Sequence, residues 1–187
     1  MSNTTTVDQP VRISLAGIAL LGAGVAVVLG VYGGLHDPTG RPLTTFGFSG
    51  MLQMKAWFAS GAAALLVVQL LTASWMWGRL PGVGSAPGWL APLHRWSGAF
   101  AFVLTLPPAV HCLWALGFLG GSPRVLLHAL AGCAFYGAYA AKMLGLRQDK
   151  LPGWALPVLG GTVLVLLTTV WLTSALWFFT RSGVPLT

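Results

Sequence analysis

The fold is decided by residues 93–146, which read LHRWSGAFAFVLTLPPAVHCLWALGFLGGSPRVLLHALAGCAFYGAYAAKMLGL and carry three of the four histidines and both cysteines. The stretch consists of two apolar runs, 93–120 and 124–146, each long enough to cross a hydrocarbon layer of about 30 Å at about 1.5 Å per helical residue. Only residues 121–123 separate the runs. The pattern therefore predicts two membrane helices that fold back on each other as antiparallel neighbours.

The composition of the whole chain is typical of a membrane protein. Hydrophobic residues make up 56% of the 187 residues and charged residues only 7%, whereas a soluble domain carries roughly a quarter charged residues. The net charge of +7 comes from basic residues scattered at predicted helix ends and in short loops. This distribution favours anionic lipid headgroups over nucleic acid as the charged partner. We therefore expect an all-α integral membrane protein.

Five apolar runs follow one another along the chain. We expect one transmembrane domain over residues 12–180, between a polar tail at 1–11 and a short tail at 181–187. The predicted spans are 12–34, 51–77, 93–120, 124–146 and 154–180. The first run is longer than the apolar segment of a cleavable signal peptide, so we expect it to remain as an anchor.

Two histidines lie at the same predicted depth on neighbouring helices. His111 falls after the middle of its run and His128 before the middle of the next, which places both roughly 7–10 Å from the midplane on the same side. Such imidazoles can hold a haem iron from both faces, while the alternative is that each hydrogen-bonds across a helix interface. Gly132 leaves space beside His128 for a porphyrin edge, and Arg124 is a candidate partner for a propionate.

Prolines and small residues predict how this hairpin packs. Pro107 and Pro108 remove two backbone donors just before His111, so the helix is expected to kink and to open room for a flat macrocycle. In the second run, small residues recur every four positions and predict a close helix contact. They are Ala129, Cys133, Gly137, Ala141 and Gly145.

Three other polar residues are candidates for a site. His94 lies 17 residues before His111, at the membrane interface, where it either stays or binds a second haem or a quinone headgroup. His36 lies beside Asp37 in a loop rich in proline and glycine, and it binds a metal, caps a turn or is solvated. Gln69 either hydrogen-bonds across helices or lines a cofactor or quinone pocket.

The loop charges indicate an orientation. Six basic residues lie on the side shared by the N-terminal tail and the second and fourth loops, against four on the other side. The positive-inside rule then predicts a cytoplasmic N-terminus and an external C-terminus in the plasma membrane. In that orientation His111, His128 and Arg124 lie toward the outer face.

Two resemblances follow from these motifs. HRWSG with His111 on the same helix, then LLHALAG and AAK on the next, resembles the transmembrane cores of the cytochrome b and ferric-reductase-like families. LHDPTG, MKAWFA, LPGWALPVLGG and WLTSALWFF look like an uncharacterised actinobacterial family of multi-pass proteins. The chain departs from two-haem members of the first group, which carry two histidines on each of two helices, commonly 13 or 14 residues apart. The resemblance therefore implies at most one conventional bis-histidine haem.

From these observations we expect a haem b electron-transfer protein or oxidoreductase subunit, with His111 and His128 as axial ligands. Bis-histidine ligation leaves no open iron position, so the protein is expected to relay electrons to an external redox protein or a quinone rather than to catalyse substrate chemistry. The alternative is a cofactor-free anchor or assembly subunit of a membrane complex.

Two further readings are open but less favoured by the residues. A copper or zinc site would use His111, Cys112, His128 and Cys133. However, Cys112 points about 100° away from His111 around the helix, so the four side chains are not expected to converge. A transporter is disfavoured because no predicted span carries an acidic residue.

Overall fold

The computed structural model describes residues 13–118 and 121–184. In these residues it contains helices and connecting loops and no strand. The predicted polar tail at 1–11, the last two residues of the predicted span 93–120 and the end of the C-terminal tail lie outside the described residues. The all-α prediction is confirmed for the described part of the chain.

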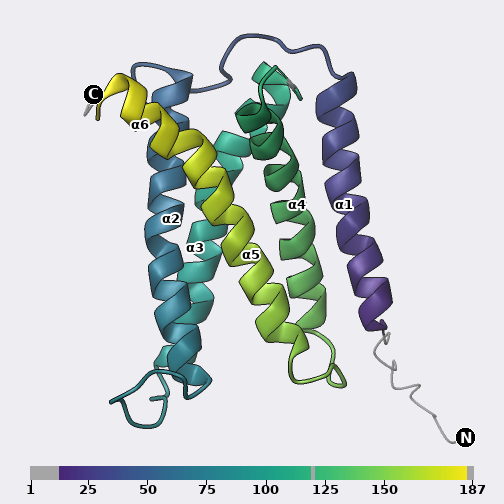
Figure 1. Cartoon of the computed structure of the whole chain (residues 1–187), viewed down its shortest axis with the longest axis vertical. Coiled ribbons are helices and arrows are strands. Elements are labelled where there is room, and N and C mark those ends of the chain that lie inside the picture. Colours follow the sequence, from purple (N-terminus) through teal and green to yellow (C-terminus); the bar gives the residue numbers. More distant parts are fainter. Residues whose placement is uncertain (1–12, 119–120, 185–187) are drawn as a thin grey trace, which may run out of the picture.

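The helices run up and down beside one another, and the connections lie at the two ends of the bundle (Figure 1). A short π-helical turn continues α3, and another joins α5 to α6 so that the two form one tilted rod. The segments are α1 (Leu15–Leu35), α2 (Met51–Met76), α3 (Leu90–His111), η1 (Cys112–Leu116), α4 (Pro123–Gly145), α5 (Ala155–Trp171), η2 (Leu172–Leu176) and α6 (Trp177–Ser182).

Four of these helical rods are long and apolar enough to cross a membrane, which corrects the prediction of five such spans. The four are Leu15–Leu35, Met51–Met76, Leu90–Leu116 and Ala155–Ser182. Helix α4 has the length, with 23 residues, but it carries Arg124, His128, Lys142 and two tyrosines. These polar side chains lower its hydropathy. They include Arg124 and His128, two of the predicted site residues.

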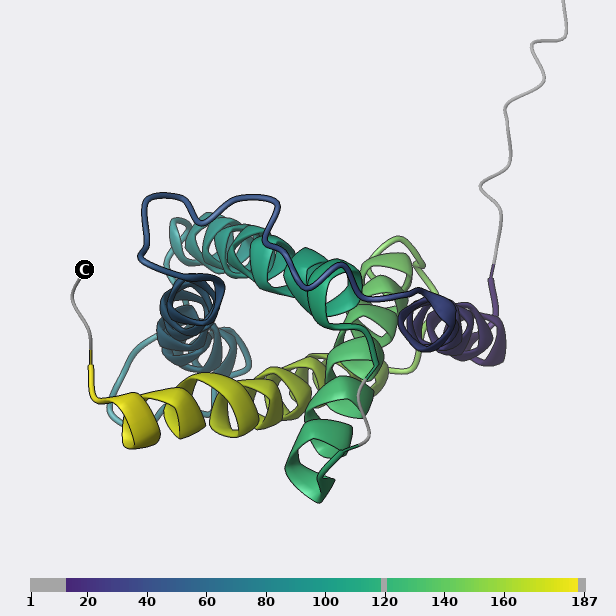
Figure 2. The same ribbon diagram turned by 90° about the horizontal axis from the view of Figure 1, so that it is seen from above.

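The hairpin also packs differently from the prediction. Helix α4 packs closely against α1 and α5, and α3 packs closely against α2, whereas α3 and α4 make no comparably close contact in the described part of the chain. Figure 2 shows α1 at the edge of the bundle, beside α4. The two helices are antiparallel as predicted, and they meet through side chains such as the stacked rings of Phe102 and Tyr139 rather than through closely packed backbones.

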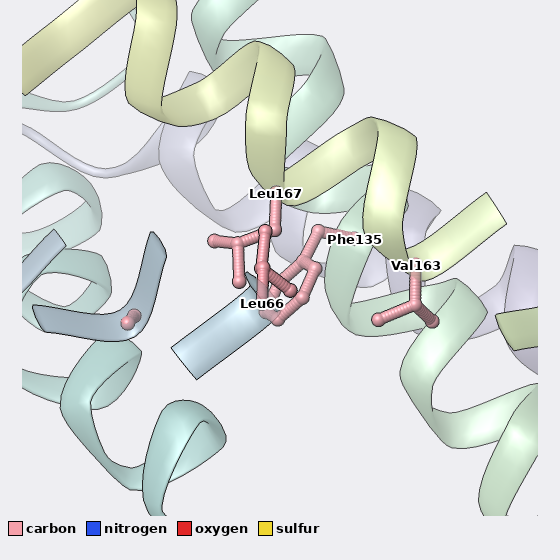
Figure 3. Packing of buried hydrophobic residues seen from close by; sticks show 5 residues of the cluster. Leu66, Phe135, Val163 and Leu167 are labelled. Carbon is pink, nitrogen blue, oxygen red and sulfur yellow. The ribbon is translucent and has the colours of Figure 1, made fainter. Parts of the chain in front are cut away.

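A small apolar core joins α2, α4 and α5. Phe135 of α4 is only 3% exposed and meets Leu66 of α2 and Leu167 of α5, with Val163 farther along α5 (Figure 3). Burying an aromatic ring and branched aliphatic side chains contributes about 1.5–3 kcal/mol per side chain in water, although in lipid the gain comes mainly from close packing. This cluster holds α4 to α5 and α2, and Phe102 and Leu104 of α3 pack against it.

The small residues of α4 form the predicted close contact, and their partner is α1. A Cβ built on Gly22 would lie 2.6 Å from the carbonyl oxygen of Gly137 and 3.0 Å from Cβ of Ala141. Real Cβ atoms essentially never approach backbone that closely. The two backbones therefore touch at a point where only glycine fits.

Helix α3 continues through Pro107 and Pro108 as far as His111, and the change of winding begins after them. The π-helical turn η1 starts at Cys112 and ends before Gly117, which has a φ of 67°. π-Helical turns inside helices are frequent at functional sites. Here the turn lies between the first loop on one side and the gap between α3 and α4 on the other.

Candidate functional site

A mainly apolar cavity of about 260 Å³ lies where α3 and α4 diverge. It is lined by side chains from every helical segment, including a single residue of α1. Most of the lining is aliphatic or aromatic, and the lining residues include no aspartate or glutamate. The polar lining residues are Lys55, Thr105, Cys112, Arg124, His128, Tyr136 and Ser174, together with the second cysteine, Cys133.

His128 presents one ring nitrogen to this cavity and has the other held by η2. The Thr173 hydroxyl donates to the backbone oxygen of Thr169 at 2.7 Å, so it accepts a hydrogen bond from Nδ1 of His128 at 3.2 Å. This bond selects the tautomer with the proton on Nδ1 and leaves a lone pair on Nε2. Ring orientation by a second polar group in this way is usual for histidines that ligate metals.

The lone pair on Nε2 of His128 faces Cys112. Nε2 lies 3.8 Å from Sγ of Cys112, close enough to accept a hydrogen bond from the thiol, and Lys55 lines the same cavity. Groups from α2, η1 and α4 thus border one cavity. Among the described residues, no cluster of three or more histidine, cysteine or acidic side chains forms a metal site.

Arg124 is fixed at the edge of the same cavity. It donates to the backbone oxygen of Thr173 at 2.5 Å, and its guanidinium lies 3.8 Å from the ring centroid of Trp177. Stacking and one hydrogen bond leave further N–H donors of the guanidinium for a bound group. Together with Lys55, Arg124 makes the polar part of the cavity cationic.

His111 points away from this cavity, to the other side of η1. It is 2% exposed; its Nδ1 donates to the backbone oxygen of Pro107 at 2.7 Å, and its Nε2 accepts from the backbone N–H groups of Leu43 and Thr44 at 3.2 and 3.4 Å. Both ring nitrogens therefore bond to the protein's own backbone. The structure does not bring His111 and His128 together as the predicted haem-ligand pair.

His36 also lies where the first loop packs against η1. Its ring stacks between Tyr32 at 5.1 Å and Trp114 at 4.8 Å. The neighbouring loop residues Thr39 and Gly40 donate to backbone oxygens of η1 at 3.2 and 3.0 Å. The aromatic stack accounts for the position of His36 without a metal, although its buried Nε2 has no hydrogen-bond partner among the described residues.

His94 and Gln69 meet at the opposite end of the bundle. The Gln69 amide donates to the backbone oxygen of His94 at 2.5 Å and to the hydroxyl of Ser97 at 2.7 Å. Nδ1 of His94 lies 2.8 Å from the hydroxyl of Thr72. Gly98 allows the close approach, because a Cβ there would lie 3.0 Å from the Gln69 side chain. These polar groups join α2 to α3 and do not line the cavity.

The sequence reasoning missed Lys55 and Cys112 as members of the site. Lys55 was not among the predicted site residues, and Cys112 was named only as one of four metal ligands that were not expected to converge. The signal available in the sequence was that Cys112 directly follows His111. Adjacent helical residues point about 100° apart, so one of the pair had to face a different neighbour.

Comparison with known proteins places the chain in a family without supplying a function. No curated protein and no solved structure matches it. The predicted resemblance to an uncharacterised family is confirmed in its general form. Residues 15–186 match the family of unknown function DUF6529, and the chain belongs to that family.

Proposed function

We propose that this chain is a five-pass membrane protein that binds one haem b in the cavity between α3 and α4 and carries electrons through it. The observation that supports the proposal best is the lone pair on Nε2 of His128, held toward an apolar cavity by the Thr173 hydroxyl. Iron in haem takes a histidine nitrogen as an axial ligand. The haem would supply the reversible one-electron chemistry, and the chain would supply binding and orientation.

The residues around the cavity fit the parts of a haem. Its apolar walls match the macrocycle, and the cations Arg124 and Lys55 match the two propionates. A Cβ built on Gly132, one turn from His128, meets no heavy atom within 4 Å, which leaves room beside the imidazole. The cavity of about 260 Å³ lies below the range of about 300–1,000 Å³ for ligand pockets, so haem binding would require the lining side chains to move apart.

The histidine pair of the original expectation is not part of this proposal. His111 has both ring nitrogens bonded to backbone groups, and a haem ligand at Nε2 would have to displace the N–H groups of Leu43 and Thr44 at a cost of about 1 kcal/mol each. His128 is therefore the one histidine proposed as a ligand. Arg124 keeps its proposed role beside a propionate.

The proposal of five passes, including α4, is supported by the exposed side chains of α4. Leu126, Leu127 and Leu130 are exposed on a helix as long as its neighbours and antiparallel to α3 (Figure 1). Lipid is the natural cover for such a face. We retain the cytoplasmic N-terminus from the charge bias in the loops, and an external redox protein or a quinone as the electron partner.

The test is haem binding by the purified full-length chain and by His128→Ala. The wild type should show a Soret band, and after dithionite it should show the α and β bands of a b-type haem. The His128→Ala variant should lose nearly all pigment at unchanged expression and helix content. His36→Ala is the matched control, because it removes a histidine that does not line the cavity, and it should keep the pigment. A colourless wild type from haem-replete cells contradicts the proposal.

The second candidate is a cofactor-free anchor or assembly subunit. It is favoured because His111 and Gln69 make hydrogen bonds to other groups of the chain. This is expected of polar residues whose only role is to join helices. In that case His128→Ala would lower thermal stability and change no spectrum.

A further inference from the structure

We infer that Cys112 is the second axial ligand of the iron, facing His128 across the cofactor. This inference rests on the proposed haem. Sγ of Cys112 lies 3.8 Å from Nε2 of His128, and both residues line the cavity. They come from different segments, η1 and α4, which approach from different sides. Two ligands on opposite faces of a haem must come from different segments, because two side chains on one face of a helix cannot reach opposite faces of a flat group.

The two atoms are at hydrogen-bonding distance, and a small movement would admit a metal between them. With the bond lengths of zinc sites, about 2.3 Å to sulfur and about 2.0–2.1 Å to an imidazole nitrogen, the two atoms would be roughly 4.3–4.4 Å apart in a linear arrangement. The observed 3.8 Å is shorter by about half an ångström, a displacement that rotation of two side chains can supply. No other cysteine or histidine lies within hydrogen-bonding range of Nε2 of His128 in the described residues.

Charge gives an independent reason for a thiolate in this position. The core of a ferric haem carries one net positive charge, and the lining of the cavity includes two cationic side chains and no acidic one. An uncompensated charge in an apolar membrane cavity is costly. A Cys112 thiolate neutralises the ferric core, and its proton is released to solvent on ligation.

Cys133 supplies a matched comparison within the same cavity. It also lines the cavity, but it lies on α4, five residues after His128. A ligand from the same helix cannot oppose His128 across a haem. The structure therefore assigns ligation to one of the two cysteines and only packing to the other.

The experiment compares wild type, Cys112→Ser and Cys133→Ser, each purified as the full chain with its haem. We measure haem per chain, the ferric absorption and electron paramagnetic resonance spectra, and carbon monoxide binding after reduction. Cys112→Ser should retain haem through His128, lose the low-spin ferric signal of a histidine–thiolate pair and bind carbon monoxide faster. Its reduction potential should rise, because an anionic donor that stabilises ferric iron is gone. Cys133→Ser should match the wild type in every spectrum.

The outcomes separate the two proposals. A pigmented Cys112→Ser variant with wild-type ferric spectra overturns the assignment of Cys112 and leaves the haem proposal standing. A wild type without haem overturns both. Equal spectral changes in the two cysteine variants also overturn the assignment, because they would report a general disturbance of the cavity.

Discussion

The two ends of the bundle hold similar polar residues in different settings. At the His94 end, a glutamine, a histidine, a serine and a threonine bridge α2 and α3, whose backbones are close enough for direct hydrogen bonds. At the His128 end, α3 and α4 stand apart, and the polar groups border a cavity. A membrane histidine is thus a helix link or a potential ligand according to the spacing of the helices around it.

Removing the group that orients His128 should have the largest effect. Thr173→Val deletes the hydroxyl that accepts from Nδ1 of His128 and keeps the shape of the side chain. Loss of such a supporting bond lowers affinity for the metal group by about 10–100-fold, or about 1.4–2.7 kcal/mol. Haem titration of the purified variant measures this. Thr162→Val, which removes another helix hydroxyl, is the control, and equal losses in both variants would refute a specific role for Thr173.

Replacing His111 should loosen the first loop and leave the haem in place. His111→Phe removes the acceptor for the N–H groups of Leu43 and Thr44, so local opening of that loop should become easier by about 1–2 kcal/mol. Hydrogen exchange at these two amides measures the change. Loss of haem from this variant would restore the bis-histidine arrangement that the sequence predicted.

Breaking the hydrogen bonds between α2 and α3 at the His94 end should lower stability and leave haem binding unchanged. Gln69→Leu removes the donor to the backbone oxygen of His94 and to Ser97. Interhelical hydrogen bonds in membrane proteins contribute about 0.6 kcal/mol on average and up to about 1.7, so we expect a loss of about 1 kcal/mol. Thermal unfolding in detergent measures the loss, and an altered haem spectrum would show that the two ends are coupled.

The smallest effect is expected at a bridge between α3 and α4 inside the cavity. The Tyr136 hydroxyl donates to the backbone oxygen of Thr105 at 3.0 Å and contacts its hydroxyl at 2.9 Å. Tyr136→Phe keeps the edge-on contact of the ring with Phe102 and should cost about 0.5 kcal/mol in thermal stability. A loss of several times that amount would mean that this bond, rather than apolar packing, holds the two helices in position.

Much of the helical architecture was accessible from the sequence, because apolar length and small-residue spacing are local properties. The runs around residues 51–77 and 154–180 became helices with nearly the predicted ends, and Gly137 lies at a close helix contact. The partner helix at that contact is α1, which the spacing on α4 alone does not identify. Arg124 and Lys142 kept α4 out of the apolar set, although its length is that of a span.

The order of the site residues along each helix is readable from the sequence, whereas the direction that each side chain faces is not. The position of a residue along a helix follows from counting, whereas the side it faces depends on which neighbours pack around it. His111 and Cys112 differ by one residue, and only the packing of the first loop against η1 turns the histidine outward and the cysteine toward His128. Lys55 lines the cavity for the same reason, because the packing of α2 decides which way it faces.

The central claim is that one end of the bundle binds a haem and the other does not. The most direct test is the number of haems per chain, measured by pyridine haemochrome assay, in wild type and in His94→Ala. The account predicts about one haem in both. Two haems in the wild type, falling to one in His94→Ala, would contradict it by making the His94 end a second site, and a wild type with none would remove the haem altogether.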